Sequence, residues 1–126
     1  MDQLLKTLPG DIPGLLRRGS PALGSPLTGD RGPCVVVAVS SAAATISYGE
    51  NLVIVPVAAL ALDLTDPTGR WQAAWWATHC PGQSGFTGWS AAEWRARDCA
   101  IWGLDMSPEQ IDTLARLVLR LAGRTP

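Results

Sequence analysis

The sequence has little charge and almost no lysine. Charged residues make up 17% of its 126 residues, the formal net charge is −1, and Lys6 is its one lysine. Residues 34–69 contain neither lysine nor arginine. Proteins that bind nucleic acids or anionic membranes through charge carry clustered basic residues. We therefore expect neither kind of partner for this chain.

Long apolar runs and cysteine pairs are lacking as well. No apolar run reaches the ~18 residues of a membrane span, and the chain does not open with the charged and apolar stretches of a signal peptide. The cysteines Cys34, Cys80 and Cys99 are widely spaced and odd in number. This pattern is typical of reduced, mostly buried thiols in a chain that is not secreted. We expect a soluble protein located in the cytoplasm, or in a virion if a phage encodes it.

No motif for catalysis or cofactor binding stands out. His79 is the only histidine and directly precedes Cys80. Together with Cys34 and Cys99, this pair would make a Cys3His set, which is a known combination of zinc ligands. However, the Cys-x2-Cys spacing is absent, and ligands adjacent in sequence strain a tetrahedral site. The glycine-rich segment 82–88 lacks the Lys-Ser/Thr pair that ends a P-loop. We expect no metal, no cofactor and no catalytic residue, and interpret 82–88 as a connector.

Proline, glycine and leucine distinguish residues 1–33 from the rest. Five of the ten prolines lie there, and they disfavour a long helix or a central strand. Between these breakers recur the leucines Leu4, Leu5, Leu8, Leu15, Leu16, Leu23 and Leu27. A flexible linker would not carry so many apolar side chains. We expect an extended N-terminal arm that lays its leucines on its own domain or on a neighbour.

Residues 34–64 predict an antiparallel β region. Their strand-forming segments, rich in Val, Ile, Thr and Tyr, are residues 34–39, 44–48, 52–57 and 61–64. The tight turn Gly49-Glu50-Asn51 joins the second segment to the third. Such a turn needs a positive φ, which we expect at Gly49 or Asn51.

The order of these elements resembles a small SH3-like barrel of the Tudor or KOW type. The resemblance covers residues 33–64 and consists of strand, strand, tight turn and a strand ending in Val55-Pro56. It implies a small antiparallel sheet, and it makes a nucleic-acid-associated module one alternative function. The aromatic cage of Tudor-type modules is not visible, since Tyr48 is the only aromatic residue in the segment.

Residues 66–123 predict three helices, each preceded by a capping residue. Asp66 stands before a proline, and Ser90 and Ser107 each begin a capping box. For the second helix an alternative stays open, because the pattern of residues 94–104 also fits a strand. The last helix has a clear apolar stripe.

Some apolar residues exceed what the core requires. Six tryptophans are many for a core of this size, so we expect one or two to serve an interface. On the last helix, Leu119 lies off the apolar stripe, while Asp112, Arg116, Arg120 and Arg124 follow at four-residue steps and predict a solvated face. The candidate partner contacts are Leu15, Leu16, Leu23, Leu27, Trp89 and Leu119.

The sequence thus predicts an α+β fold: an arm over residues 1–33, then a single domain over residues 34–126 with a small antiparallel sheet and about three helices. The arm, the surplus tryptophans and the sparse charge favour a non-enzymatic interaction or structural subunit that binds a protein partner or forms a homo-oligomer. One such structural subunit is a virion accessory protein, for example a cement or head-completion subunit. A small inhibitor or adaptor of a larger protein, or an SH3-like nucleic-acid-associated module, are the alternatives.

Overall fold

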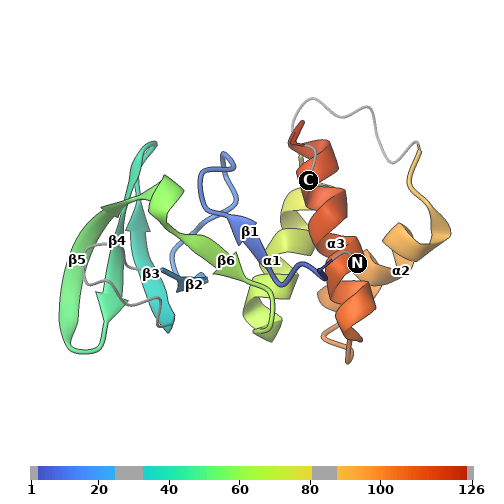
Figure 1. Ribbon diagram of the computed structural model, residues 1–126, viewed down its shortest axis with the longest axis horizontal. Coiled ribbons are helices and arrows are strands. Elements are labelled where there is room, and N and C mark those ends of the chain that lie inside the picture. Colours follow the sequence, from blue (N-terminus) through green and yellow to red (C-terminus); the bar gives the residue numbers. More distant parts are fainter. Residues whose placement is uncertain (1–2, 25–32, 81–87, 125–126) are drawn as a thin grey trace.

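A six-stranded antiparallel sheet and three helices make up the residues that the computed structural model describes, 3–24, 33–80 and 88–124. The elements are β1 (Thr7–Pro9), β2 (Pro21–Leu23), β3 (Pro33–Val39), β4 (Ala43–Tyr48), β5 (Asn51–Pro56), the 3-10 turn η1 (Val57–Ala59), β6 (Ala61–Asp63), α1 (Pro67–Thr78), α2 (Ala91–Ile101) and α3 (Pro108–Leu121). Figure 1 shows the curled sheet at one end of the molecule and the helices at the other. The predicted α+β class is confirmed.

The strands predicted between residues 34 and 64 all form. β3, β4 and β5 are sequential neighbours in the sheet, whose order is β1-β6-β2-β3-β4-β5. The ladder between β4 and β5 runs from Tyr48–Asn51 to Ala43–Pro56, so the turn has two central residues. Gly49 has φ 62°, which confirms the expected left-handed residue. The strand order does not test the SH3-like resemblance, which stays a prediction.

Replacing Gly49 by valine is expected to destabilise the protein through backbone strain alone. A Cβ at this position would meet no atom within 4 Å, so steric contact contributes nothing. A β-branched residue held at positive φ costs on the order of 1–2 kcal/mol. Urea denaturation should show a loss of that size for Gly49→Val, and an unchanged midpoint would contradict the turn geometry.

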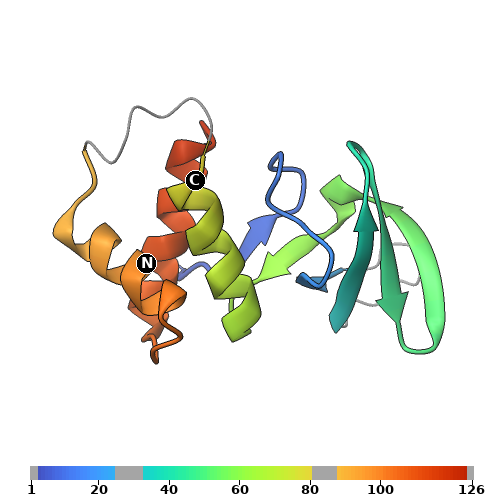
Figure 2. The same ribbon diagram turned by 180° about the vertical axis from the view of Figure 1, so that it is seen from behind.

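The N-terminal segment is part of the sheet and the core, so of the two positions left open for the arm it takes the one on its own domain, and it is not a unit separate from residues 34–126. β1 pairs with β6, and β2 lies between β6 and β3. The loop between β1 and β2 buries Ile12, Leu15 and Leu16 in the same cluster as Val36 and Ile46. Figure 2 shows this loop beside the sheet, between the strands and the helices. The domain therefore begins near the first described residues and not at residue 34.

Local capping signals correctly located the three helices. The Asp66 side chain accepts a hydrogen bond from the Thr68 N–H, and Ser90 and Ser107 each form a complete capping box. The helix α2 continues to Ile101. This excludes the alternative of a strand over residues 94–104. Gly103, with φ 68°, ends the turn that follows α2.

The side chains of Arg116, Arg120 and Arg124 remain partly exposed, as the predicted solvated face requires, and two of them also form ion pairs with other elements. Arg116 pairs with Asp112 on the same helix, but Arg120 reaches Glu93 of α2 at 2.7 Å, and Arg124 reaches Asp11 in the loop after β1. Burial by itself would raise the pKa of Glu93. The hydrogen bonds from Ser90 and Arg120, with the Arg120 charge, outweigh that effect and lower the pKa below its ordinary value.

Candidate protein interface

An apolar sheet surface is exposed on β3, β4 and β5. In the ladders, Val35 pairs with Ser47, which pairs with Leu52, so these three side chains lie on one face. On the next rung, Thr45 pairs with Ile54 and faces Val37 and Ala38, where a β-bulge sets two residues of β3 against one of β4. We call this surface the outer face; its residues are Val35, Val37, Ala38, Thr45, Ser47, Leu52 and Ile54.

The large side chains of the outer face are open to solvent. Val35 is 48% exposed, Leu52 69% and Ile54 70%. Residues on the opposite face, by contrast, belong to the core: Ile46 is fully buried. Isolated exposed apolar residues are common, whereas several on one face of a sheet make that face a candidate interaction site.

The outer face has hydroxyl residues on its middle strand and apolar residues on the strands to either side. The β4 hydroxyl residues Thr45 and Ser47 are half-buried, and larger apolar side chains stand on both sides of them, on β3 and β5. At one end the surface deepens into an open depression of about 240 Å³. Its lining residues are Ala38, Val39, Ser40, Ala43, Ala44, Thr45 and Ile54. The outer face therefore offers hydroxyl groups on β4 and apolar contacts on β3 and β5.

Charge is almost absent around this surface. Between Pro33 and Val57 the one charged residue is Glu50, and it lies in the β4–β5 turn. A surface without basic residues is unsuited to phosphate backbones, whose binding depends on Lys and Arg. Its composition instead matches the fully buried centre of a protein interface, where charged residues are depleted.

Three of the six predicted partner contacts are buried in the core. Leu15, Leu16 and Leu119 are 1%, 5% and 8% exposed, so all three belong to the core and the prediction for them is wrong. For Leu15 and Leu16 the reason is that the N-terminal segment folds into the sheet. Leu119 is covered because α3 contacts β1 as well as α1 and α2.

The remaining predicted contacts have mixed positions. Leu23 is half-buried and pairs with Pro33, two residues from Val35, so it borders the outer face. Trp89 is half-buried, with its ring 4.8 Å from that of Trp94, and it packs partly against the core. Leu27 lies outside the described residues, as does most of the glycine-rich segment 82–88.

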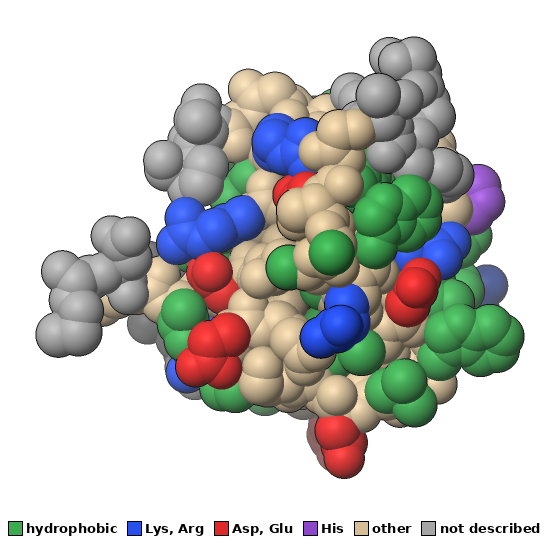
Figure 3. All heavy atoms as spheres, turned by 90° about the vertical axis from the view of Figure 1, so that its right-hand side faces the viewer, with side chains coloured by type: hydrophobic (Ala, Val, Ile, Leu, Met, Phe, Trp, Pro, Cys, Tyr) green, Lys and Arg blue, Asp and Glu red, His purple; other side chains and the backbone are tan. Residues whose placement is uncertain are grey.

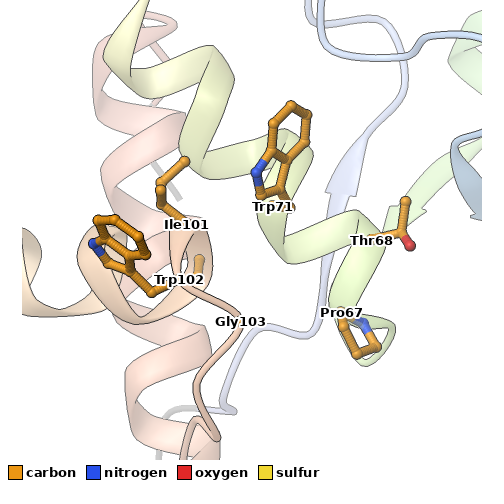
Figure 4. A pocket seen from close by; sticks show the side chains of 7 residues that line it. Pro67, Thr68, Trp71, Ile101, Trp102 and Gly103 are labelled. Atoms are coloured by element: carbon orange, nitrogen blue, oxygen red, sulfur yellow. The ribbon is translucent and has the colours of Figure 1, made fainter.

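A second exposed apolar region lies on the helices. Trp71 of α1 and Trp102 after α2 face a shallow, open cleft of about 380 Å³ (Figure 4). Trp102 is 76% exposed, and Leu104 nearby in sequence is 56% exposed. We call the cleft lined by Trp71 and Trp102 the tryptophan cleft. On the helical end of the molecule, hydrophobic side chains form separate groups among charged residues of both signs (Figure 3). The outer face is the more continuous apolar surface.

His79 and the cysteines have structural surroundings. His79 caps the C-terminus of α1, its ring stacks on Trp75 with centroids 4.2 Å apart, and the Arg17 guanidinium lies 3.6 Å from the Trp75 ring centroid. Burial raises the pKa of the Cys34 and Cys80 thiols. Within the described part of the chain, no three His, Cys, Asp or Glu residues lie close enough to hold a metal ion.

Two apolar runs in the sequence indicate strands that are apolar on both faces. The segment 34–39 reads CVVVAV and the segment 52–57 reads LVIVPV, with apolar residues at both odd and even positions. Side chains alternate between the two faces of a strand, so such runs are apolar on both faces. The structure covers one of these faces with the core and leaves the other open.

No protein-family model, no curated protein and no solved structure matches this chain. Among the described residues, no helix has the length and apolar character needed to cross a membrane.

Proposed function

We propose that this chain is a non-enzymatic interaction or structural subunit that binds protein through its outer face. The observation that carries the proposal is the exposure of Val35 on β3 and of Leu52 and Ile54 on β5, on one face of the sheet and on either side of β4, without a charged residue among them. Covering side chains of this type contributes about 25 cal/mol per Å² of apolar area. The low charge of the surface favours a protein partner over a nucleic acid.

The test is the mass of the native assembly, isolated by cross-linking from the cells that make the protein. A double variant Leu52→Thr/Ile54→Thr removes the two most exposed apolar side chains of the outer face and keeps strand-forming residues. The matched control, Trp102→Thr/Leu104→Thr, removes two comparably exposed side chains from the helical end.

We expect the native protein to be recovered with bound protein in fixed stoichiometry, as a heteromer or as a homo-oligomer. That association should be lost in the Leu52/Ile54 variant and kept in the Trp102/Leu104 variant. Recovery of the native chain alone, or loss of association only in the Trp102/Leu104 variant, would refute an interface on the outer face.

A further inference from the structure

At the edge of the sheet formed by β5, next to the outer face, lie backbone groups that no described strand pairs. Within residues 3–24, 33–80 and 88–124, β5 is a terminal strand of the sheet and its one partner is β4. Figures 1 and 2 place it at the end of the molecule opposite the helices, so these do not cover it. Exposed strand edges are templates for pairing with another strand.

The ladder determines which residues of β5 direct their backbone groups to this edge. The Val57 N–H donates to the Ala42 carbonyl at 3.0 Å, which continues the β4–β5 ladder by one residue. Backbone groups alternate in direction along a strand, so the odd-numbered residues bond to β4. Leu52 and Ile54 therefore present their N–H and C=O groups outward. Pro56, also outward, lacks an N–H and loses no ladder bond.

Pro56, at the C-terminal end of β5, is the one residue of this strand that disfavours pairing, and the edge from Asn51 to Val55 has no such residue. Native sheets protect such edges with lysine, bulges or inward-pointing charges. The bulge of this sheet is in β3, and β5 itself (Asn51–Pro56) has no charged residue. Its outward side chains on the outer face, Leu52 and Ile54, are the most exposed aliphatic residues of the three strands.

We propose that the partner at this edge is a second copy of the chain, joined by antiparallel pairing of β5 with β5 about a two-fold axis at Val53. This deepens the proposed function, on which it rests. In this register Leu52 of one copy lies opposite Ile54 of the other, and each such pair exchanges both backbone hydrogen bonds. The same pair recurs across the axis, so every outward N–H of β5 finds an acceptor.

Charge and side-chain placement fit a symmetric pair. An isologous interface sets the same patch against itself, which disfavours any patch with net charge near the axis. The one charge near β5, on Glu50, lies at the strand end, so the two copies of Glu50 are at opposite ends of the paired strands. The Leu52 and Ile54 side chains of both copies then form one continuous apolar cluster on the joined outer faces.

The test is sedimentation equilibrium of the purified full chain over a range of concentrations, for the native protein and three variants. Ile54→Pro removes an outward N–H that β4 does not use. Ile54→Lys keeps the N–H and adds a charge on both sides of the axis. The control Leu104→Lys adds the same charge at a comparably exposed site away from the sheet. Circular dichroism of each variant checks that the fold is retained.

We expect a dimer that Ile54→Pro and Ile54→Lys each weaken by at least about tenfold in dissociation constant, while Leu104→Lys leaves it unchanged. Amide exchange should also slow at Leu52 and Ile54 on dimerisation, which packing of the outer faces without strand pairing would not cause.

A dimer that persists in the Ile54→Pro variant, or whose Leu52 and Ile54 amides exchange as in the monomer, would overturn β5 pairing. A native monomer at all concentrations would overturn it as well. That monomer could still bind a different protein, and the Leu52→Thr/Ile54→Thr variant could fail to bind it. In that case the proposed function holds and only the pairing with a second copy is refuted. If the monomer binds no protein, both proposals fail.

Discussion

Deleting residues 1–24 is expected to leave a chain that no longer folds cooperatively. In the strand order β1-β6-β2-β3-β4-β5, β2 is the only link between β6 and β3. Its removal divides the sheet in two. The deletion also removes the backbone acceptor of the Trp76 indole N–H, which donates to the Pro13 carbonyl at 2.9 Å.

The magnitude of the lost burial supports complete unfolding. Leu8, Ile12 and Leu15 are at most 1% exposed, and Leu16 is 5% exposed. Burying four such side chains contributes roughly 6–12 kcal/mol at about 1.5–3 kcal/mol each. Whole domains are stable by only about 5–15 kcal/mol. The deletion therefore removes an amount comparable to the entire stability.

Circular dichroism and a urea titration of the truncated chain check this expectation. Two point variants give a graded control within the same segment: Leu8→Ala should cost about 2–5 kcal/mol, while Leu4→Ala, at a side chain 40% exposed, should cost far less. A truncated chain with a native spectrum and a cooperative transition would show that the segment is dispensable.

Replacing Gly69 by alanine should destabilise the protein even though alanine favours helices. Gly69 lies in the first turn of α1, and a Cβ there would collide with the Asp63 carbonyl oxygen. Helix propensity favours alanine by about 1 kcal/mol. The contact is with backbone, so no side-chain rotation relieves it, and α1 must move away from β6. Overpacking of this kind costs about 1–3 kcal/mol or more, so we expect a net loss of stability.

The control for this substitution is Thr68→Ala, one residue earlier in the same turn. Thr68 is exposed, and the described hydrogen bond there uses its backbone N–H, not its side chain. Thr68→Ala should change the free energy of unfolding by less than about 0.5 kcal/mol. Equal or higher stability of Gly69→Ala in urea denaturation would contradict the close approach of α1 to β6.

The parts of the fold that sequence predicted correctly are those with local signals. A capping residue and the helix it begins are a few residues apart, as at Asp66, Ser90 and Ser107. The β4–β5 hairpin is likewise determined by a two-residue turn with Gly49 at positive φ. Such features depend on neighbours in the chain, so one sequence suffices to find them.

The N-terminal strands could not be found in this way. β1 and β2 have three residues each, and each contains a proline at one end. Leu8 pairs with Leu62, more than fifty residues away. Neither strand is long enough to show the alternation of apolar and polar residues by which a strand is predicted from sequence. The leucines indicated that the segment docks on something, and only the three-dimensional pairing shows that it docks within its own sheet.

The candidate interface was missed for a related reason. The apolar runs of β3 and β5 predict strands whichever face is buried, and only the fold shows which face remains open. Conversely, Leu119 lies off the apolar stripe of α3 and yet is buried. A helix that contacts a strand as well as two helices buries more than one stripe, which a single-stripe analysis does not anticipate.

The central claim is that protein covers the outer face in the assembled state. The most direct measurement is the attenuation of side-chain NMR signals by a soluble paramagnetic probe, in the assembly isolated from its source and in the dissociated chain. We predict that the methyl groups of Val35, Leu52 and Ile54 are attenuated in the dissociated chain and protected in the assembly, while the Trp102 indole stays accessible in both. Methyl groups that remain accessible in the assembly, with Trp102 protected instead, would contradict the claim and place the interface at the tryptophan cleft.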